Sequence, residues 1–281
     1  MPPALICLDS PLILTDGGRR ILPSSMMTHA KRLIGLDIGT FSVKAVELTR
    51  NGNDLTVTAA AQAPVPSPTE LSGAVREILR LGGFHTKLTC LNVSGRYVSV
   101  KYITLPSMGD ADLKKALPFE ADKHIPFEVG DACLDGQRIG EETAGAKDMT
   151  AVLAAAKRNL VLERAQLASS CGLAPAIVDV DVFALGNAFG IGAGSIRAAD
   201  RSVALVDLGA SKTSVNILKG SDTRFTREIY VGGNDITEVI AKRLSLPQSM
   251  AETTKCDPGG QEAACRAAAA ATLEDLANEV R

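Results

Sequence analysis

The chain has 281 residues, of which 46% are hydrophobic and 22% charged; this composition supports a large buried core and excludes a wholly disordered protein. Its 30 Lys and Arg against 32 Asp and Glu give a formal net charge of -2, which argues against a general nucleic-acid-binding surface. No apolar run has the roughly 20 residues of a membrane-spanning helix.

Residues 1–30 show no sustained hydrophobic period. Their short apolar runs are separated by turn formers, and no basic segment or cleavage-like site accompanies them, so a signal peptide is not indicated. The tandem Met26-Met27 directly precedes the first strongly patterned segment. We expect residues 1–30 to be disordered or to lie upstream of the true start, and both alternatives stay open.

Two segments that repeat at an offset of 170 residues carry the fold prediction. In each, an apolar strand ends in Asp-apolar-Gly and is followed by a short polar turn and a second apolar strand, at 33–48 and 203–218. A third strand and a helix with apolar residues at helical spacing follow in both copies. The sequence therefore predicts a duplicated α/β unit, with a first lobe at 31–200 and a second at 201–281.

The two repeated turns have the chemistry of a phosphate site, because a tight turn containing Gly exposes backbone N–H groups. An Asp just before such a turn can hold a hydrated Mg²⁺ that bridges the phosphates. A lysine on the strand leaving the first turn adds positive charge. The candidate residues are Asp37, Gly39, Thr40 and Lys44 in the first copy and Asp207, Gly209 and Ala210 in the second, with Asp37 and Asp207 holding the metal through water. Alternatively, these residues build ordinary hairpin turns.

The stretch between the repeats has a pattern of its own. Strands are predicted at 90–93 and 97–105, joined by a turn, and a helix is predicted from near Leu113 after an aspartate cap. Pro118 should kink this helix unless the helix begins there, and a later proline ends it. We expect an inserted α+β subdomain at about 88–145, with a simple core-filling excursion as the alternative.

The paired hairpins resemble the phosphate-binding hairpins of the ATPase superfamily that contains actin, the chaperone DnaK and the sugar kinases. Within it, the stretch 105–127, with its Leu-Pro-x-Met turn, charged helix and Ile-Pro-Phe ending, resembles the PilM family of type IV pilus assembly, relatives of FtsA. The resemblance covers roughly residues 31–281. It implies an α/β fold of duplicated actin-like, ribonuclease H-like domains with a small inserted α+β subdomain, and ATP and Mg²⁺ bound between the two lobes.

The resemblance also implies a function. The protein would be a cytoplasmic ATP-binding scaffold, peripheral to the inner membrane, that binds the cytoplasmic N-terminal peptide of the inner-membrane protein PilN. Neither nucleic acid nor direct membrane contact is expected. The chain has no Walker A sequence and no nucleophile elbow, so its sequence points to no catalytic residue. ATP hydrolysis is expected to be weak or absent. An FtsA-like division protein, which needs an amphipathic membrane helix, and a small-molecule kinase of the same superfamily remain alternatives.

A partner surface is predicted in the inserted stretch. Large apolar residues beside turns and a proline-broken helix suggest a peptide groove between the first lobe and the subdomain. The candidates are Met108, Phe119, Ile125 and Phe127. The alternative is that their side chains are buried within the subdomain.

The superfamily's Gly-rich adenosine element has no counterpart after the helix predicted from near Glu262. The chain therefore resembles a C-terminally truncated member, and the candidate adenosine contacts that remain are Gly232, Gly233 and, further along, Lys255. Asp179, in the connection before the second repeat, is expected either to line the nucleotide cleft or to cap a strand.

Overall fold

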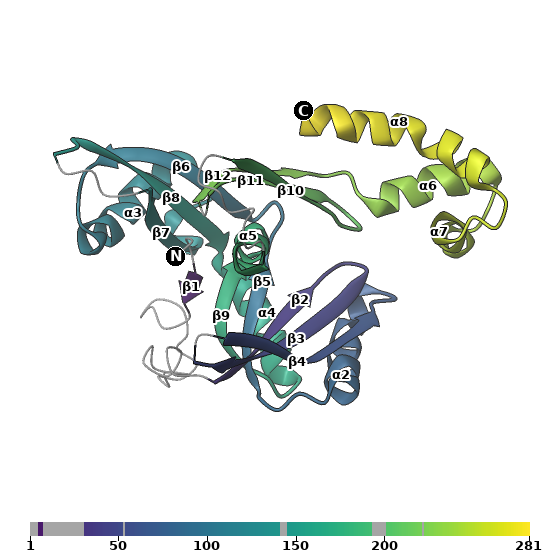
Figure 1. Ribbon diagram of the computed structural model, residues 1–281, viewed down its shortest axis with the longest axis horizontal. Helices are drawn as coiled ribbons and strands as arrows, with labels where there is room; N and C mark the ends of the chain where they lie inside the picture. The colour runs from purple at the N-terminus through teal and green to yellow at the C-terminus, as the bar shows by residue number, and fades with distance from the viewer. Residues whose placement is uncertain (1–4, 8–30, 53, 141–144, 193–200, 221) are drawn as a thin grey trace. The chain divides into compact units, whose positions relative to one another are not determined.

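The computed structural model describes residues 5–7, 31–52, 54–140, 145–192, 201–220 and 222–281. They fall into two units (Figure 1), Met1–Arg201 with Lys219–Arg224 and Ser202–Leu218 with Phe225–Arg281. The division lies close to the lobe boundary expected from the sequence. Of residues 1–30, the described part is Leu5–Cys7; the rest of that expectation lies outside the described residues.

The first unit is built on a six-stranded sheet in the order β1-β9-β5-β2-β3-β4. Its strands are β1 (Leu5–Cys7), β2 (Arg32–Ile38), β3 (Ser42–Asn51), β4 (Asp54–Pro64), β5 (Leu88–Val93) and β9 (Ala174–Val180). β2, β3 and β4 form an antiparallel meander, β5 and β9 continue the sheet parallel to β2, and β1 pairs antiparallel with β9. The carboxyl ends of β2, β5 and β9 therefore lie at one edge of the sheet.

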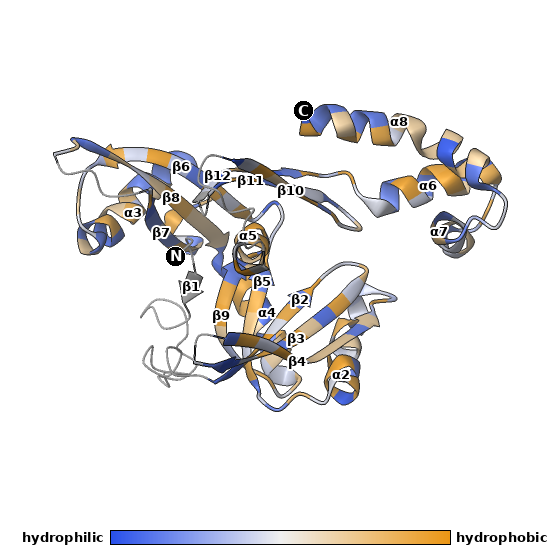
Figure 2. Ribbon diagram, viewed as in Figure 1, coloured by the Kyte–Doolittle hydropathy of each residue, from blue (hydrophilic) through white to orange (hydrophobic). Residues whose placement is uncertain are grey.

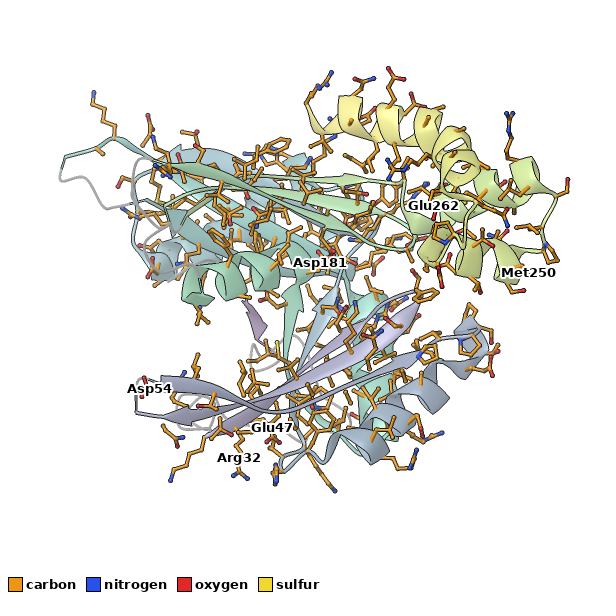
Figure 3. The ribbon with its side chains drawn as sticks, turned by 45° about the vertical axis from the view of Figure 1, so that its right-hand side comes forward. Arg32, Glu47, Asp54, Asp181, Met250 and Glu262 are labelled. Carbon is orange, nitrogen blue, oxygen red and sulfur yellow. The ribbon has the colours of Figure 1, made fainter. Side chains whose placement is uncertain are left out.

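Two helices cover one face of this sheet. α2 (Leu71–Gly82) follows the short helix η1 (Pro68–Glu70), and α4 (Arg158–Ser170) precedes β9. Their apolar residues join alternate residues of β2 and β3 in one buried cluster. β9 is a nearly continuous hydrophobic strand (Figure 2), as expected for a strand that is buried on both sides. The next helix, α5 (Asp181–Gly192), packs against β5 and β9 and begins at Asp181 (Figure 3).

The inserted stretch forms a three-stranded sheet in the order β6-β8-β7. Its elements are β6 (Val98–Pro106), α3 (Asp110–His124), η2 (Val129–Asp131), β7 (Ala132–Ile139) and β8 (Asp148–Lys157). α3 covers one face, while Val152 and Ala154 on the other face pack with Val182 and Phe183 of α5.

The inserted sheet extends over 98–157, so its bounds differ from the expected 88–145. β5 lies in the six-stranded sheet, because an apolar pattern predicts a strand but not the sheet in which it pairs. Gly109 is the N-cap of α3, and Pro118 lies inside the helix rather than at its start.

The second unit repeats the order of hairpin, strand and helix. Its sheet has the order β10-β11-β12, formed by β10 (Ser202–Leu208), β11 (Thr213–Lys219) and β12 (Asp222–Ile229). The helices are α6 (Gly233–Leu244), α7 (Gln248–Cys256) and α8 (Glu262–Val280), and Figure 3 labels Met250 on α7 and Glu262 on α8. Leu276 of α8 packs on Val215 and Ile229 of the sheet. None of the helices in the described ranges is long and apolar enough to span a bilayer.

Candidate functional site

The two predicted turns share one backbone geometry. The N–H of Gly39 donates to the carbonyl oxygen of Ser42 at 3.2 Å, and the N–H of Gly209 donates to that of Lys212 at 2.9 Å. A Cβ added at Gly39 would lie 2.8 Å from the Ser42 oxygen, and one at Gly209 would lie 2.9 Å from the Lys212 oxygen. Both positions therefore need glycine, because the backbone approaches closely there. The two segments that repeat in sequence also repeat the same hydrogen bond.

Asp37 lies at the carboxyl end of β2 and is held from both sides. Its Oδ2 is 3.3 Å from Nζ of Lys44, the residue opposite on β3, and its Oδ1 accepts a hydrogen bond of 2.9 Å from Nδ2 of Asn92 on β5. Oδ1 of Asn92 in turn accepts from the N–H of Ile38 at 3.1 Å. Asn92 was not predicted, because only the parallel pairing of β2 with β5 brings it to the turn.

Asp37 also interacts with a cation on α4. Burial lowers the pKa of Arg164, and the neighbouring carboxylates of Asp37 and Glu163 oppose that shift. The Asp37 side chain is 47% exposed, so it remains accessible to solvent between Lys44 and Arg164. Lys44 and Arg164 therefore place two cations near the half-exposed Asp37 carboxylate, and Glu163 adds a second carboxylate beside Arg164.

Asp179 lies at the carboxyl end of β9 as the Cα partner of Asn92. Because β2, β5 and β9 are adjacent and parallel, Asp37, Asn92 and Asp179 come from neighbouring strand ends. Asp179 is 4% exposed, and burial raises its pKa to about 7; the hydrogen bond from the Val180 N–H opposes the shift, while Asp181 adds to it. The group therefore exchanges protons near neutral pH, a property that is enriched at functional sites.

The predicted adenosine contacts hold the second turn against α6. The N–H of Gly233 donates to the carbonyl oxygen of Gly209 at 2.9 Å, and the N–H of Gly232 donates to Oδ2 of Asp235 at 2.8 Å. A Cβ added at Gly232 would lie 2.7 Å from the oxygens of both Gly209 and Ala210. Since both N–H groups are engaged within the protein, any contribution of Gly232 and Gly233 to a ligand site is through their lack of side chains.

Lys255 of α7 fixes the start of α6. Its Nζ donates to the oxygen of Gly233 at 3.1 Å, to Oγ1 of Thr237 at 2.8 Å and to Oε2 of Glu252 at 2.6 Å. The amino group of Lys255, a predicted adenosine contact, is therefore engaged within the protein, where it holds Gly233 at the start of α6. Asp207, by contrast, is the second-to-last residue of β10 and has an exposed side chain.

Metal ligation at the two aspartates would be through water. Across the described ranges, no three His, Cys, Asp or Glu side chains are grouped to hold a metal ion. Single exposed carboxylates suit Mg²⁺, which keeps several of its waters and needs only one or two carboxylates beside phosphate. Asp37 and Asp207, each taken within its own unit, therefore each offer a carboxylate of the kind that a hydrated magnesium ion takes as a ligand.

The four predicted partner residues differ in exposure. Met108 and Ile125 are half-buried against the core of the inserted sheet. The ring of Phe127 is half-buried, with Nζ of Lys157 6.0 Å from its centroid. Phe119, on α3, is 75% exposed. Of the four, Phe119 is the side chain that presents a large apolar surface to solvent.

Comparison with known proteins identifies the family. The family model of the type IV pilus assembly protein PilM matches residues 35–264. The chain belongs to the PilM family. A solved PilM-PilN type IV pilus biogenesis complex is similar to it, with a TM-score of 0.78 and 25% identity over 88% of this chain and 75% of that chain.

A second solved structure extends the likeness beyond the PilM family. The ethanolamine utilization protein EutJ from Carboxydothermus hydrogenoformans has a TM-score of 0.50 and 17% identity over 97% of this chain and 76% of that chain, a likeness of fold alone. The predicted α/β, actin-like fold is confirmed, and the chain is a type IV pilus assembly protein with the actin-like ATPase fold.

Proposed function

We propose that this PilM-family protein binds Mg²⁺ and ATP through its two Asp-x-Gly hairpins. The observation that carries the proposal is the identical turn in both units, each closed by a glycine N–H bond and preceded by an aspartate. Because the glycine N–H closes each turn, the N–H groups that would bind phosphate oxygens in this proposal are those of the next residues, Thr40 and Ala210. The family match also favours this interpretation over the FtsA-like and kinase alternatives.

The residues around the first turn have distinct roles in this proposal. Lys44, now 3.3 Å from Asp37, would turn to a phosphate oxygen, and Asn92 would keep the Asp37 carboxylate aimed at the waters of the metal. Asp207 would do the same in the second unit. Bound Mg²⁺ would neutralise the phosphate charge. Asp179 has a pKa near that of a general base at neutral pH, but hydrolysis is expected to be weak or absent.

Calorimetry of the chain with ATP and Mg²⁺ tests this site. Lys44→Met and Asp207→Asn change exposed side chains, so we expect both variants to fold. Each should lower the ATP affinity about tenfold, which corresponds to a loss of roughly 1.4 kcal/mol of binding free energy. Lys101→Met is the matched control, because Lys101 is an exposed lysine on β6. Equal affinity in the wild type and both site variants would contradict the proposal.

We further propose that the protein acts in the cytoplasm, at the inner membrane face, by binding the N-terminal peptide of a PilN-like membrane protein. The similar solved structure is a PilM-PilN complex, which supports a PilN partner. Phe119 is the best candidate anchor, because aromatic side chains dominate the energetics of interfaces and this one is 75% exposed.

Fluorescence anisotropy with a labelled PilN N-terminal peptide measures this contact. Phe119→Ala should weaken binding at least tenfold without lowering the melting temperature, since truncation of an exposed anchor removes contacts only from the complex. Leu81→Ala is the control, because Leu81 is 56% exposed at the end of α2. A Phe119→Ala variant that captures the peptide as well as the control does would place the contact elsewhere.

A further inference from the structure

A cavity of about 170 Å³ lies in the first unit at the amino ends of β2 and β5, the opposite end of these strands from Asp37 and Asn92. Its walls are apolar, formed by Leu33, Leu48, Leu55, Leu88 and Ile177. An apolar cavity of about 150 Å³ is large enough for benzene. The hollow can therefore receive one aromatic ring or one branched aliphatic side chain.

Three cations surround this hollow: Lys31, Arg32 and Arg50. Figure 3 labels Arg32 on β2 and Asp54 at the start of β4. Among the described residues, none of the three cationic side chains has a hydrogen bond or ion-pair partner, and Asp54 pairs with none of them. Within the part of the chain that the structure describes, three positive charges without such partners thus lie at one apolar opening, in a protein of net charge -2. Its occupant should combine negative charge with a single bulky apolar group.

The apolar walls of the cavity are on the face of the sheet away from α2 and α4, and Arg32, the first residue of β2, lies at its rim. Leu33 alternates along β2 with Ile34, and Ile34 packs in the cluster beneath those two helices. None of the cavity residues belongs to the hairpin turns or to the Met108–Phe127 stretch. The opening is therefore separate from both sites already proposed.

We propose that this cavity binds an acidic peptide segment, with one large apolar side chain in the hollow and carboxylates on both sides paired with Lys31, Arg32 and Arg50. β4 is the outermost strand on this side of the described sheet, and its Leu55 and Val57 are 41% and 61% exposed. An extended peptide would find main-chain hydrogen-bonding groups there. A peptide fits better than an anionic bilayer. The cavity can accept one apolar side chain from a partner, whereas membrane binding needs apolar groups of the protein that insert into the bilayer.

The test uses a fluorescein-labelled peptide, acetyl-Asp-Glu-Phe-Glu-Asp-amide, titrated with the full chain by anisotropy. The triple variant Lys31→Gln, Arg32→Gln, Arg50→Gln should raise the Kd about tenfold or more, and replacing the peptide's Phe by Ala should do the same. The Kd should also rise severalfold between low and high salt, because the cations are exposed. Arg76→Gln is the control, since Arg76 is an exposed arginine on α2, across the sheet.

Equal binding by the wild type and the triple variant, or by the Phe and Ala peptides, would overturn the proposal. So would a wild-type chain that ignores the peptide but sediments with phosphatidylglycerol vesicles through the same three cations, which would assign the surface to a membrane. Lys44→Met and Phe119→Ala should leave peptide binding unchanged. These variants therefore distinguish a failure of this proposal from a failure of the proposed ATP and PilN sites.

Discussion

Replacing Glu47 by Gln should weaken the first unit through a single buried carboxylate. The Glu47 side chain is 0% exposed on β3 and accepts hydrogen bonds from Oγ1 of Thr58 at 2.7 Å, the N–H of His85 at 2.6 Å and the N–H of Thr86 at 3.2 Å. Burial alone would raise the pKa of Glu47, but the hydrogen bonds from Thr58 and His85 outweigh it and lower the pKa from 4.5 to about 2.

The expected cost follows from the number and charge of these bonds. A hydrogen bond to a charged group contributes about 1.5–3 kcal/mol and a neutral one about 0.5–1.5 kcal/mol, and an unsatisfied buried donor costs about 1–3 kcal/mol. Gln keeps the shape of Glu47 but has one acceptor oxygen, and its NH₂ must face at least one of the donors. We therefore expect the free energy of unfolding to fall by about 2–4 kcal/mol at neutral pH.

The pH dependence gives a second, independent check. Because the folded pKa of Glu47 lies below the unfolded value, its stabilising contribution is complete above a pH of about 4.5 and is lost as the pH falls toward 2. Urea unfolding followed by circular dichroism should show the difference between the wild type and Glu47→Gln shrinking from about pH 5 downward, with most of it lost near pH 2. Glu77→Gln, at an exposed helix pair with Arg80, is the control and should leave the urea midpoint unchanged. A Glu47→Gln variant as stable as the wild type at pH 7, or a difference that does not change with pH, would refute the reasoning.

Three further changes test other parts of the structure. Gly232→Ala should lower the melting temperature by several degrees and weaken ATP binding, because its Cβ would lie 2.7 Å from two carbonyl oxygens of the second turn; unchanged melting would show that the turn can move aside. Gly73→Ala, in the first turn of α2 where a Cβ meets nothing within 4 Å, should instead stabilise the protein by about 0.5–1 kcal/mol, as measured by urea unfolding. Burial, together with the carboxylate of Asp179, raises the pKa of Cys90 to about 12, so this thiol has almost no reactive thiolate at pH 8. Cys90→Ser should therefore leave the fast phase of thiol labelling at pH 8 unchanged, whereas Cys256→Ser, at an exposed cysteine, should reduce it.

The hairpins and helices of both units follow from local pattern. Strand alternation, the glycine of each turn and the helical spacing of apolar residues are properties of neighbouring residues, so the repeat could be predicted together with its turn glycines Gly39 and Gly209. The positions of Asp37 and Lys44 opposite one another on β2 and β3 also follow from a hairpin register. This much of the candidate site is encoded within about ten residues of each turn.

The rest of the site depends on pairing between distant segments. Asn92 reaches Asp37 because β5 lies parallel to β2, and Asp179 comes to the next strand end because β9 lies parallel to β5. Glu47 gains the N–H groups of His85 and Thr86 only when the loop after α2 folds over β3. Nothing in the residues around Asn92 distinguishes a site residue from any asparagine in a strand. The role of Gly232 against the second turn likewise requires the start of α6 to be placed in space.

The inserted sheet enters and leaves the first unit at one point. Val98 at the start of β6 pairs with Ala156 near the end of β8, the N–H of Lys157 donates to the oxygen of Tyr97 at 2.9 Å, and Nζ of Lys157 lies 4.6 Å from the centroid of the Tyr97 ring. Adjacent chain ends are what make a domain insertion tolerable to its host. The stretch 98–157 can therefore be treated as a cassette. Evolution or a designer could exchange this stretch and so change what the protein recognises. A short linker between its two adjacent ends would leave the strand ends that carry Asp37, Asn92 and Asp179 in place.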